Sequence, residues 1–178
     1  MTIEVGDIVN VKGKDQSWIG KMISWFTDSE FTHTAVVVAV NNDDVAVVEA
    51  QWLNFNDSVY SYEWIKNNAK YGSFKKFDTE DDKILFIYEC MKLIGKPYDY
   101  PAILTIGANI LYRRYILRQD KETIRKRLIT YKSSKLLFCS EAISRICKMF
   151  GVDLCPELDD DMITPGDIAE SEVIKWKN

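Results

Sequence analysis

The alternation of apolar and polar positions along the chain first predicts a β-sheet. Residues 3–11 alternate well enough for a strand, with a turn or kink at Gly6-Asp7. Residues 32–40 and 45–52 are two runs rich in β-branched side chains, and the NNDD between them is typical of a hairpin turn. Because both faces of these runs are apolar, we expect the hairpin to lie centrally in a sheet that is covered on each side.

Other segments have the apolar spacing of helices. Residues 17–26 carry an apolar stripe, and residues 79–95 begin with a threonine N-cap that acidic residues follow. A further helix is expected over residues 134–151, which end in a glycine. The polar and aromatic residues 54–74 are interpreted as loops with one short helix at residues 62–67.

Length and composition indicate one domain and limit its partners. The 178 residues are 47% hydrophobic, and no repeat or flexible linker divides them, so we expect a single α+β domain over residues 1–178. The net charge of −4 gives no sign of nucleic-acid binding. The chain shows no signal-peptide pattern, and its longest apolar stretch, PAILTIGANILY, is too short to span a bilayer. We therefore expect a cytoplasmic protein, unless another export route carries it.

The four cysteines differ in their positions on the predicted elements. Cys139 lies on an apolar stripe in the first turn of its helix, where unpaired N–H groups and the helix dipole stabilise a thiolate. Cys90 and Cys147 lie deeper in their helices and fit core packing, whereas Cys155 lies in a loop. In a reducing cytoplasm all four are expected to be free thiols. Their spacing and a single histidine match no compact zinc site, so we expect no metal and no cofactor.

The order of several short motifs resembles a known family. GKPYDY followed by FCSEAIS is similar to the GxPYxxG…DCSGLV signature of NlpC-type papain-like cell-wall peptidases. The block FTHTAVVV…VVEAQW precedes the cysteine, as in the circularly permuted YiiX/YebB-like branch, which is related to the lecithin retinol acyltransferase group. GDIV and TPGDIAES fit that branch too. Ser140-Glu141 in place of Ser-Gly and the long gap before Cys139 depart from the pattern. The resemblance implies a circularly permuted papain-like (NlpC-type) α+β fold, with a central antiparallel sheet or barrel and the nucleophile helix packed on it.

Carried over to this sequence, the resemblance implies Cys139 as nucleophile, His33 as general base and Glu49 as the group that orients the imidazole. It also implies Tyr98 as a hydroxyl near the thiol and the oxyanion. The residues agree with this chemistry, because a cysteine hydrolase needs a thiolate, an imidazole and a third group that fixes the tautomer. The structural alternatives are a buried strand histidine, a strand-end carboxylate that reaches water and a tyrosine packed after a proline turn.

Three functional classes follow. The first is a thiol-dependent amide hydrolase, with a peptide or acyl-amide substrate and cell-wall peptides as the substrate that the resemblance implies. The second is a thiol acyltransferase or lipid esterase, which uses the same acyl-enzyme with a different leaving group or acceptor. The third is a non-catalytic binding module, against which the joint presence of Cys139, His33 and Glu49 argues. The oligomeric state is left open.

Residues 101–135 are expected to form a helical basic insertion. From Arg113 to Lys135 there are nine Lys or Arg against Asp120 and Glu122. One interpretation is a helical hairpin with a solvated basic face that docks against the acidic PELDDDM stretch. The other is a cap beside the active-site cleft that contacts an anionic polymer or a membrane surface.

Strand parity adds a geometric prediction. If the hairpin loop were the four residues 41–44, Val36 would oppose Glu49, and His33 would project from the other face. The proposed pair therefore requires an odd-length loop or a β-bulge, which brings Glu49 diagonally beside His33 on one face. We expect Cys139 to dock over that face.

Overall fold

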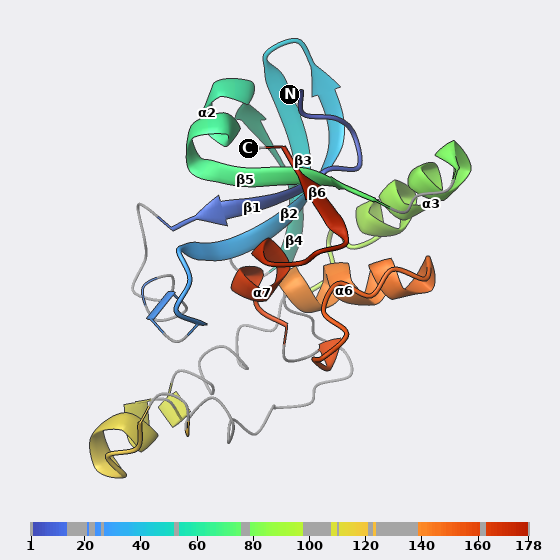
Figure 1. Ribbon diagram of the computed structural model, residues 1–178. Coiled ribbons are helices and arrows are strands. Elements are labelled where there is room, and N and C mark those ends of the chain that lie inside the picture. Colours follow the sequence, from blue (N-terminus) through green and yellow to red (C-terminus); the bar gives the residue numbers. More distant parts are fainter. Residues whose placement is uncertain are drawn as a thin grey trace.

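An open six-stranded antiparallel sheet forms the centre of the molecule (Figure 1). Its strand order is β4-β3-β2-β1-β5-β6, so β4 and β6 lie at the two edges. The strands are β1 (Ile8–Lys12), β2 (Phe31–Asn41), β3 (Asp44–Gln51), β4 (Asn54–Ser61), β5 (Ala69–Phe74) and β6 (Ile174–Trp176). The computed structural model describes residues 2–13, 21, 24–25, 27–51, 54–75, 79–97, 108–109, 111–120, 123, 139–160 and 163–177.

Helices lie on both faces of this sheet (Figure 1). The described helices are α2 (Tyr62–Asn68), α3 (Glu80–Met91), the π-helix η1 (Tyr112–Ile116), α6 (Cys139–Met149) and α7 (Pro165–Ala169). Helices α3, α6 and α7 contact β2, whereas α2 contacts β1, β4 and β5. The fold is therefore a mixed α+β arrangement in which the central strands are covered on both sides.

Strand β2 separates two apolar cores. Val36 packs in one core with residues of α3 and α6, among them Phe86 and Ile143. Ala35 and Val37 pack in the other core, which also contains Ile65 of α2. Because side chains alternate along a strand, His33 projects to the same side as Ala35 and Val37.

A buried chain of hydrogen bonds attaches α7 to the central strands. Thr34 Oγ1 donates to Asn10 Oδ1 at 2.6 Å, and Asn10 Nδ2 donates to the carbonyl of Pro165 at 2.9 Å. Removing one member would leave a buried polar group unsatisfied, which costs about 1–3 kcal/mol. Helix α7 begins with a capping box made by Thr164 and Asp167. These contacts fix the strand position next to His33.

Several expected elements are confirmed. The hairpin occupies β2 and β3, and α3 begins after the N-cap Thr79, whose side chain accepts the Asp82 N–H. Gly95 follows the end of α3 with φ +82°, a conformation in which glycine avoids strain. The sheet is open and therefore not the barrel that was the alternative expectation. The expected helix over residues 17–26 lies largely outside the described residues.

The expectation of loops over residues 54–74 is wrong except for the short helix. This stretch forms β4 and β5 on either side of α2. Strand β4 is an edge strand with alternating half-buried and exposed positions, and its half-buried side chains are polar or aromatic rather than aliphatic. The sequence therefore lacks the apolar run that identified β2 and β3. Most of the expected insertion at residues 101–135 lies outside the described residues.

Candidate active site

Three of the expected site residues come from three different elements. Cys139 is the first residue of α6, His33 is near the beginning of β2, and Glu49 is near the end of β3. The structure brings all three together, through a His33–Glu49 contact and a hydrogen bond between the side chains of His33 and Cys139. Tyr98, the fourth expected residue, lies outside the described residues.

A β-bulge sets the register that lets His33 meet Glu49. Asn41 pairs with Asp44 across the turn, and the register then shifts between Val37 and Ala39, so that Ala35 pairs with Glu49. The extra residue in β2 changes which face of β3 lies beside His33. His33 Nε2 is 2.8 Å from Glu49 Oε2, which confirms the predicted bulge and the predicted shared face.

Strand β4 supplies two hydroxyl groups to Glu49 that the sequence analysis missed. Tyr60 Oη donates to Glu49 Oε1 at 2.7 Å, and the Ser58 side chain also bonds this carboxylate. Tyr60 pairs with Val45 and Ser58 with Val47, so both project to the Glu49 face. The Tyr60 ring stacks on Trp64 of α2, with centroids 4.4 Å apart. Residues 54–61 (NFNDSVYS) show no regular alternation of polar and apolar residues, so no local signal identified β4.

The carboxylate is buried, and its contacts keep it ionised. The Glu49 side chain is only 2% exposed. Burial raises its pKa, but the hydrogen bonds and charge of His33, with the Ser58 and Tyr60 hydrogen bonds, outweigh burial and lower the pKa to about 2. A charged Glu49 therefore faces His33 throughout the neutral range.

The imidazole and the thiol stabilise each other's charged forms. Burial lowers the pKa of His33, yet its bonds to Cys139 and Glu49 raise that pKa to about 10. Burial raises the pKa of the Cys139 thiol, but the His33 hydrogen bond and charge outweigh it, so the pKa is lowered. Because Nε2 faces Glu49, Nδ1 is the ring nitrogen left for the thiol. These directions favour a thiolate–imidazolium pair.

Two backbone N–H groups also stabilise the sulfur, those of Thr34 and Ser140. The body of α6 packs with Val36 and Val48, on the face opposite to Glu49. The expectation for Cys139 thus holds for its side chain, which bonds that of His33, while the body of the helix packs on the other face. Because the Thr34 N–H lies in the backbone of β2 rather than on one face, the thiol meets the strand from the first turn of α6.

The residues after Cys139 have structural partners. The Ser140 hydroxyl donates to the carbonyl of Ile163, and Glu141 forms an ion pair with Arg145 at 2.6 Å. Both side chains are buried. The departure from Ser-Gly at this point is therefore accommodated by bonds within α6 and to the chain before α7.

The other three cysteines lack the environment of Cys139. Cys90 and Cys147 are buried in the core beside α3 and α6, and burial raises the pKa of each thiol. Burial, with a smaller effect of the Asp167 and Asp153 charges, raises the pKa of Cys155 to about 11. All four thiols are free, and Cys139 is the one whose pKa is lowered.

Comparisons with known proteins show the fold. No family model matches the chain, and no curated protein matches it. Among solved structures it is similar to the metalloprotein YiiX (DUF1105) from Escherichia coli O157:H7, with a TM-score of 0.64 and 13% sequence identity. The alignment covers 100% of this chain and 98% of YiiX, so the likeness extends over the whole fold. No helix that the structure describes combines the length and apolar content needed to cross a bilayer.

Proposed function

We propose that this protein is a cysteine hydrolase of the permuted papain-like type, which cleaves an amide through an acyl-enzyme on Cys139. The observation that carries the proposal is the contact of Cys139 with His33, whose other nitrogen meets the buried Glu49 at 2.8 Å. A nucleophile, a base and an orienting carboxylate are the parts that thiol-dependent acyl transfer requires. The likeness to YiiX agrees with the fold.

In the first half-reaction the Cys139 thiolate attacks the substrate carbonyl carbon, and the π electrons move to the carbonyl oxygen. Backbone N–H groups at the start of α6 are suited to stabilise that oxyanion. As the tetrahedral intermediate collapses, the C–N bond breaks, and the His33 imidazolium gives its proton to the departing amine. The product is a thioester on Cys139, with neutral His33 held in place by Glu49.

In the second half-reaction water attacks the thioester while His33 accepts one of its protons. Collapse of the new intermediate releases the carboxylic acid and regenerates the thiolate beside the imidazolium. Glu49 stays ionised and compensates the positive charge of His33 in both steps. If an alcohol or amine replaced water as the acceptor, the same residues would perform acyl transfer.

The proposal uses no metal. YiiX is described as a metalloprotein. In the part of the chain that the structure describes, however, no three His, Cys, Asp or Glu side chains are grouped as metal ligands. The Nε2 atom of His33 is already engaged by Glu49. The described residues therefore do not fit such a site, and no step is routed through an ion.

Labelling with electrophilic acyl-amide and acyl-ester probes tests the proposal. We expect a covalent adduct on Cys139, located by mass spectrometry, that is lost in His33→Ala and retained in the matched control Cys155→Ala. A stronger signal with amide probes supports the hydrolase of peptides or acyl amides. A preference for ester probes would instead support the esterase or acyltransferase. Failure of both probe types to label Cys139 would refute an acyl-enzyme mechanism.

A further inference from the structure

The π-helix η1 and its neighbours expose apolar and basic side chains together. We define the η1 surface as the apolar residues Leu111, Tyr112, Tyr115, Ile116 and Leu117 together with Arg113, Arg114 and Arg118. The side chains of Tyr115 and Ile116 are 72% and 67% exposed, so both lie mostly in solvent. No acidic residue interrupts residues 111–118. Exposed apolar side chains in such a cluster indicate an interaction site.

The backbone holds this surface in a defined turn. The Leu117 N–H donates to the carbonyl of Tyr112 at 3.2 Å, and the Gln119 N–H donates to the carbonyl of Arg113 at 3.0 Å. Arg118 adopts a φ of +52°, which ends the turn. The exposed side chains thus project from a hydrogen-bonded element.

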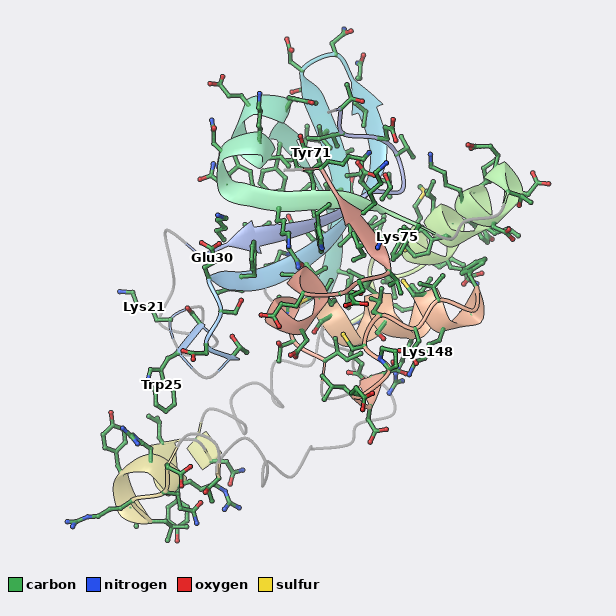
Figure 2. All side chains as sticks on the ribbon, viewed as in Figure 1. Lys21, Trp25, Glu30, Tyr71, Lys75 and Lys148 are labelled. Atoms are coloured by element: carbon green, nitrogen blue, oxygen red, sulfur yellow. The ribbon has the colours of Figure 1, made fainter. Side chains whose placement is uncertain are left out.

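A second aromatic residue adjoins this surface. The guanidinium of Arg114 lies over the ring of Trp25, 5.9 Å from its centroid, and Trp25 is itself exposed. Figure 2 shows Trp25 beside η1, with both set apart from the sheet and from helices α6 and α7. Tryptophan, tyrosine and arginine next to aliphatic side chains are typical of proteins that bind at the water–lipid interface.

The charge of the chain is strongly segregated along the sequence, with basic residues concentrated in the segment that contains η1. Residues 113–135 contain nine Lys or Arg and two acidic residues, a contribution of +7 to the net charge of −4. All other residues together therefore contribute −11. An anionic partner is repelled by most of this protein and attracted to the segment that contains η1. In the acidic stretch that follows α6, Asp160 does not pair with the described residues of this basic segment. It pairs with Lys148 of α6 at 3.0 Å.

We propose that the η1 surface binds the surface of an anionic lipid bilayer, with Tyr115 and Ile116 entering the interface and the arginines contacting lipid phosphates. A soluble anionic polymer would engage the arginines but would leave the five apolar side chains in water. A bilayer accommodates both, because its phosphates lie directly above its acyl chains. The proposal concerns binding and is independent of the chemistry at Cys139.

The apolar side of α3 provides a matched control surface. Ile84 and Tyr88 are 60% and 58% exposed, close to the values for η1, but the first turn of α3 contains Glu80, Asp81 and Asp82. Lys92 lies over the Tyr88 ring but pairs with Glu89 at 2.8 Å, and α3 itself contains four acidic residues and one lysine, so the charge around this surface is mainly acidic. We therefore expect it to stay in water when η1 meets an anionic bilayer.

Sedimentation of the full chain with phosphatidylcholine vesicles, with and without phosphatidylglycerol, tests the proposal. We expect binding to the anionic vesicles, which added salt weakens. Ile116→Ser should weaken this binding about tenfold, because it removes an apolar side chain that enters the bilayer. Arg113→Gln and Arg114→Gln should each weaken it about fivefold. Ile84→Ser and Tyr88→Ser should have no effect.

Three outcomes would overturn this proposal. One is the absence of binding to anionic vesicles. Another is equal loss in the α3 variants, which indicates a non-specific effect. The third is tight binding to heparin that competes with vesicles and is unchanged in Ile116→Ser, which assigns the surface to a polyanion. Repeating the experiment with Cys139→Ala keeps the result separate from any failure of the proposed catalysis.

Discussion

Helix α6 contains two buried cysteines with opposite properties. Cys139 opens the helix, and Cys147 lies about two turns further along on the same apolar stripe. The exposed fractions are 5% and 1%, so both thiols are removed from water. Yet the pKa of Cys147 is raised well above its ordinary value by burial, whereas the pKa of Cys139 is lowered. Burial and residue type are shared, and therefore neither explains the difference.

The neighbours of each sulfur account for it. Cys147 packs among apolar side chains of the core that contains Cys90 and Phe86. Cys139 instead meets the imidazole of His33 and the N–H groups of Thr34 and Ser140, which oppose the effect of burial. The reactivity of a buried thiol thus depends on the polar donors that reach the sulfur. Each prediction below alters one part of this contrast.

The largest effect is expected from replacing Cys139 with alanine, and Cys147→Ala is the variant for comparison. Cys139→Ala removes the nucleophile and should lower the turnover of a cleaved substrate by a factor on the order of 10⁴ or more. Cys147→Ala should retain turnover and reduce the free energy of unfolding by about 1–2 kcal/mol, because it leaves a small cavity. Kinetics and urea unfolding of both variants provide the measurement. Comparable loss of turnover in the two variants would contradict the assignment.

Alkylation should separate the thiols without any substrate. At pH 6 iodoacetamide should modify Cys139 at least about a hundredfold faster than Cys147 or Cys155, because only its thiolate is stabilised. Mass-spectrometric mapping over time gives the individual rates. In His33→Ala the Cys139 rate at pH 6 should fall toward those of the other thiols. Uniform labelling of the wild-type protein would remove the basis for a nucleophilic Cys139.

The same contrast shows what the sequence could predict. The first-turn position of Cys139 and the deep positions of Cys90 and Cys147 follow from helical periodicity, and the structure confirms the core packing of the latter two. The bulge between His33 and Glu49 could be predicted because side-chain parity along a strand is a local rule. These features depend on residues close together in the chain.

Features that depend on distant pairing were not predictable. Strand β4 lacks an apolar run, so neither the strand nor the bonds from Tyr60 and Ser58 to Glu49 could be derived from the pattern. The approach of α6 from the opposite face was also missed, because it depends on how a helix distant in sequence packs on the sheet. Asp57, the other carboxylate near this site in the sequence, pairs with Val48 and therefore projects to the face opposite to Glu49.

Glu49→Gln should weaken the stabilisation of His33 while keeping an acceptor for its N–H. We expect a loss of activity of about 10²–10⁴-fold with a measurable remainder. Because the folded pKa of Glu49 is lowered from 4.5 to about 2, its contribution to stability is present above pH 4.5 and is lost as the pH falls toward 2. Urea unfolding between these pH values should therefore show a smaller decline for Glu49→Gln than for the wild type. Wild-type activity in this variant would indicate another orienting group.

The smallest effect is expected at Tyr60, whose hydroxyl bonds Glu49 and so acts on the site through that carboxylate. Tyr60→Phe removes the hydroxyl that donates to Glu49 Oε1 at 2.7 Å but keeps the ring that stacks on Trp64, so the fold should persist. Removing one hydrogen bond to a charged group costs about 1.5–3 kcal/mol. Because the Ser58 bond remains, we expect only about a three- to tenfold loss of activity, which corresponds to about 0.6–1.4 kcal/mol and lies below that range. The informative measurement is the pH dependence of Cys139 alkylation. A less stabilised Glu49 holds the imidazolium less well, so the apparent pKa of the thiol should rise in Tyr60→Phe.

Tyr88→Phe on the exposed side of α3 is the matched control and should leave the profile unchanged. If both variants match the wild type, Tyr60 has a packing role only, and the contrast between Cys139 and Cys147 is set without strand β4.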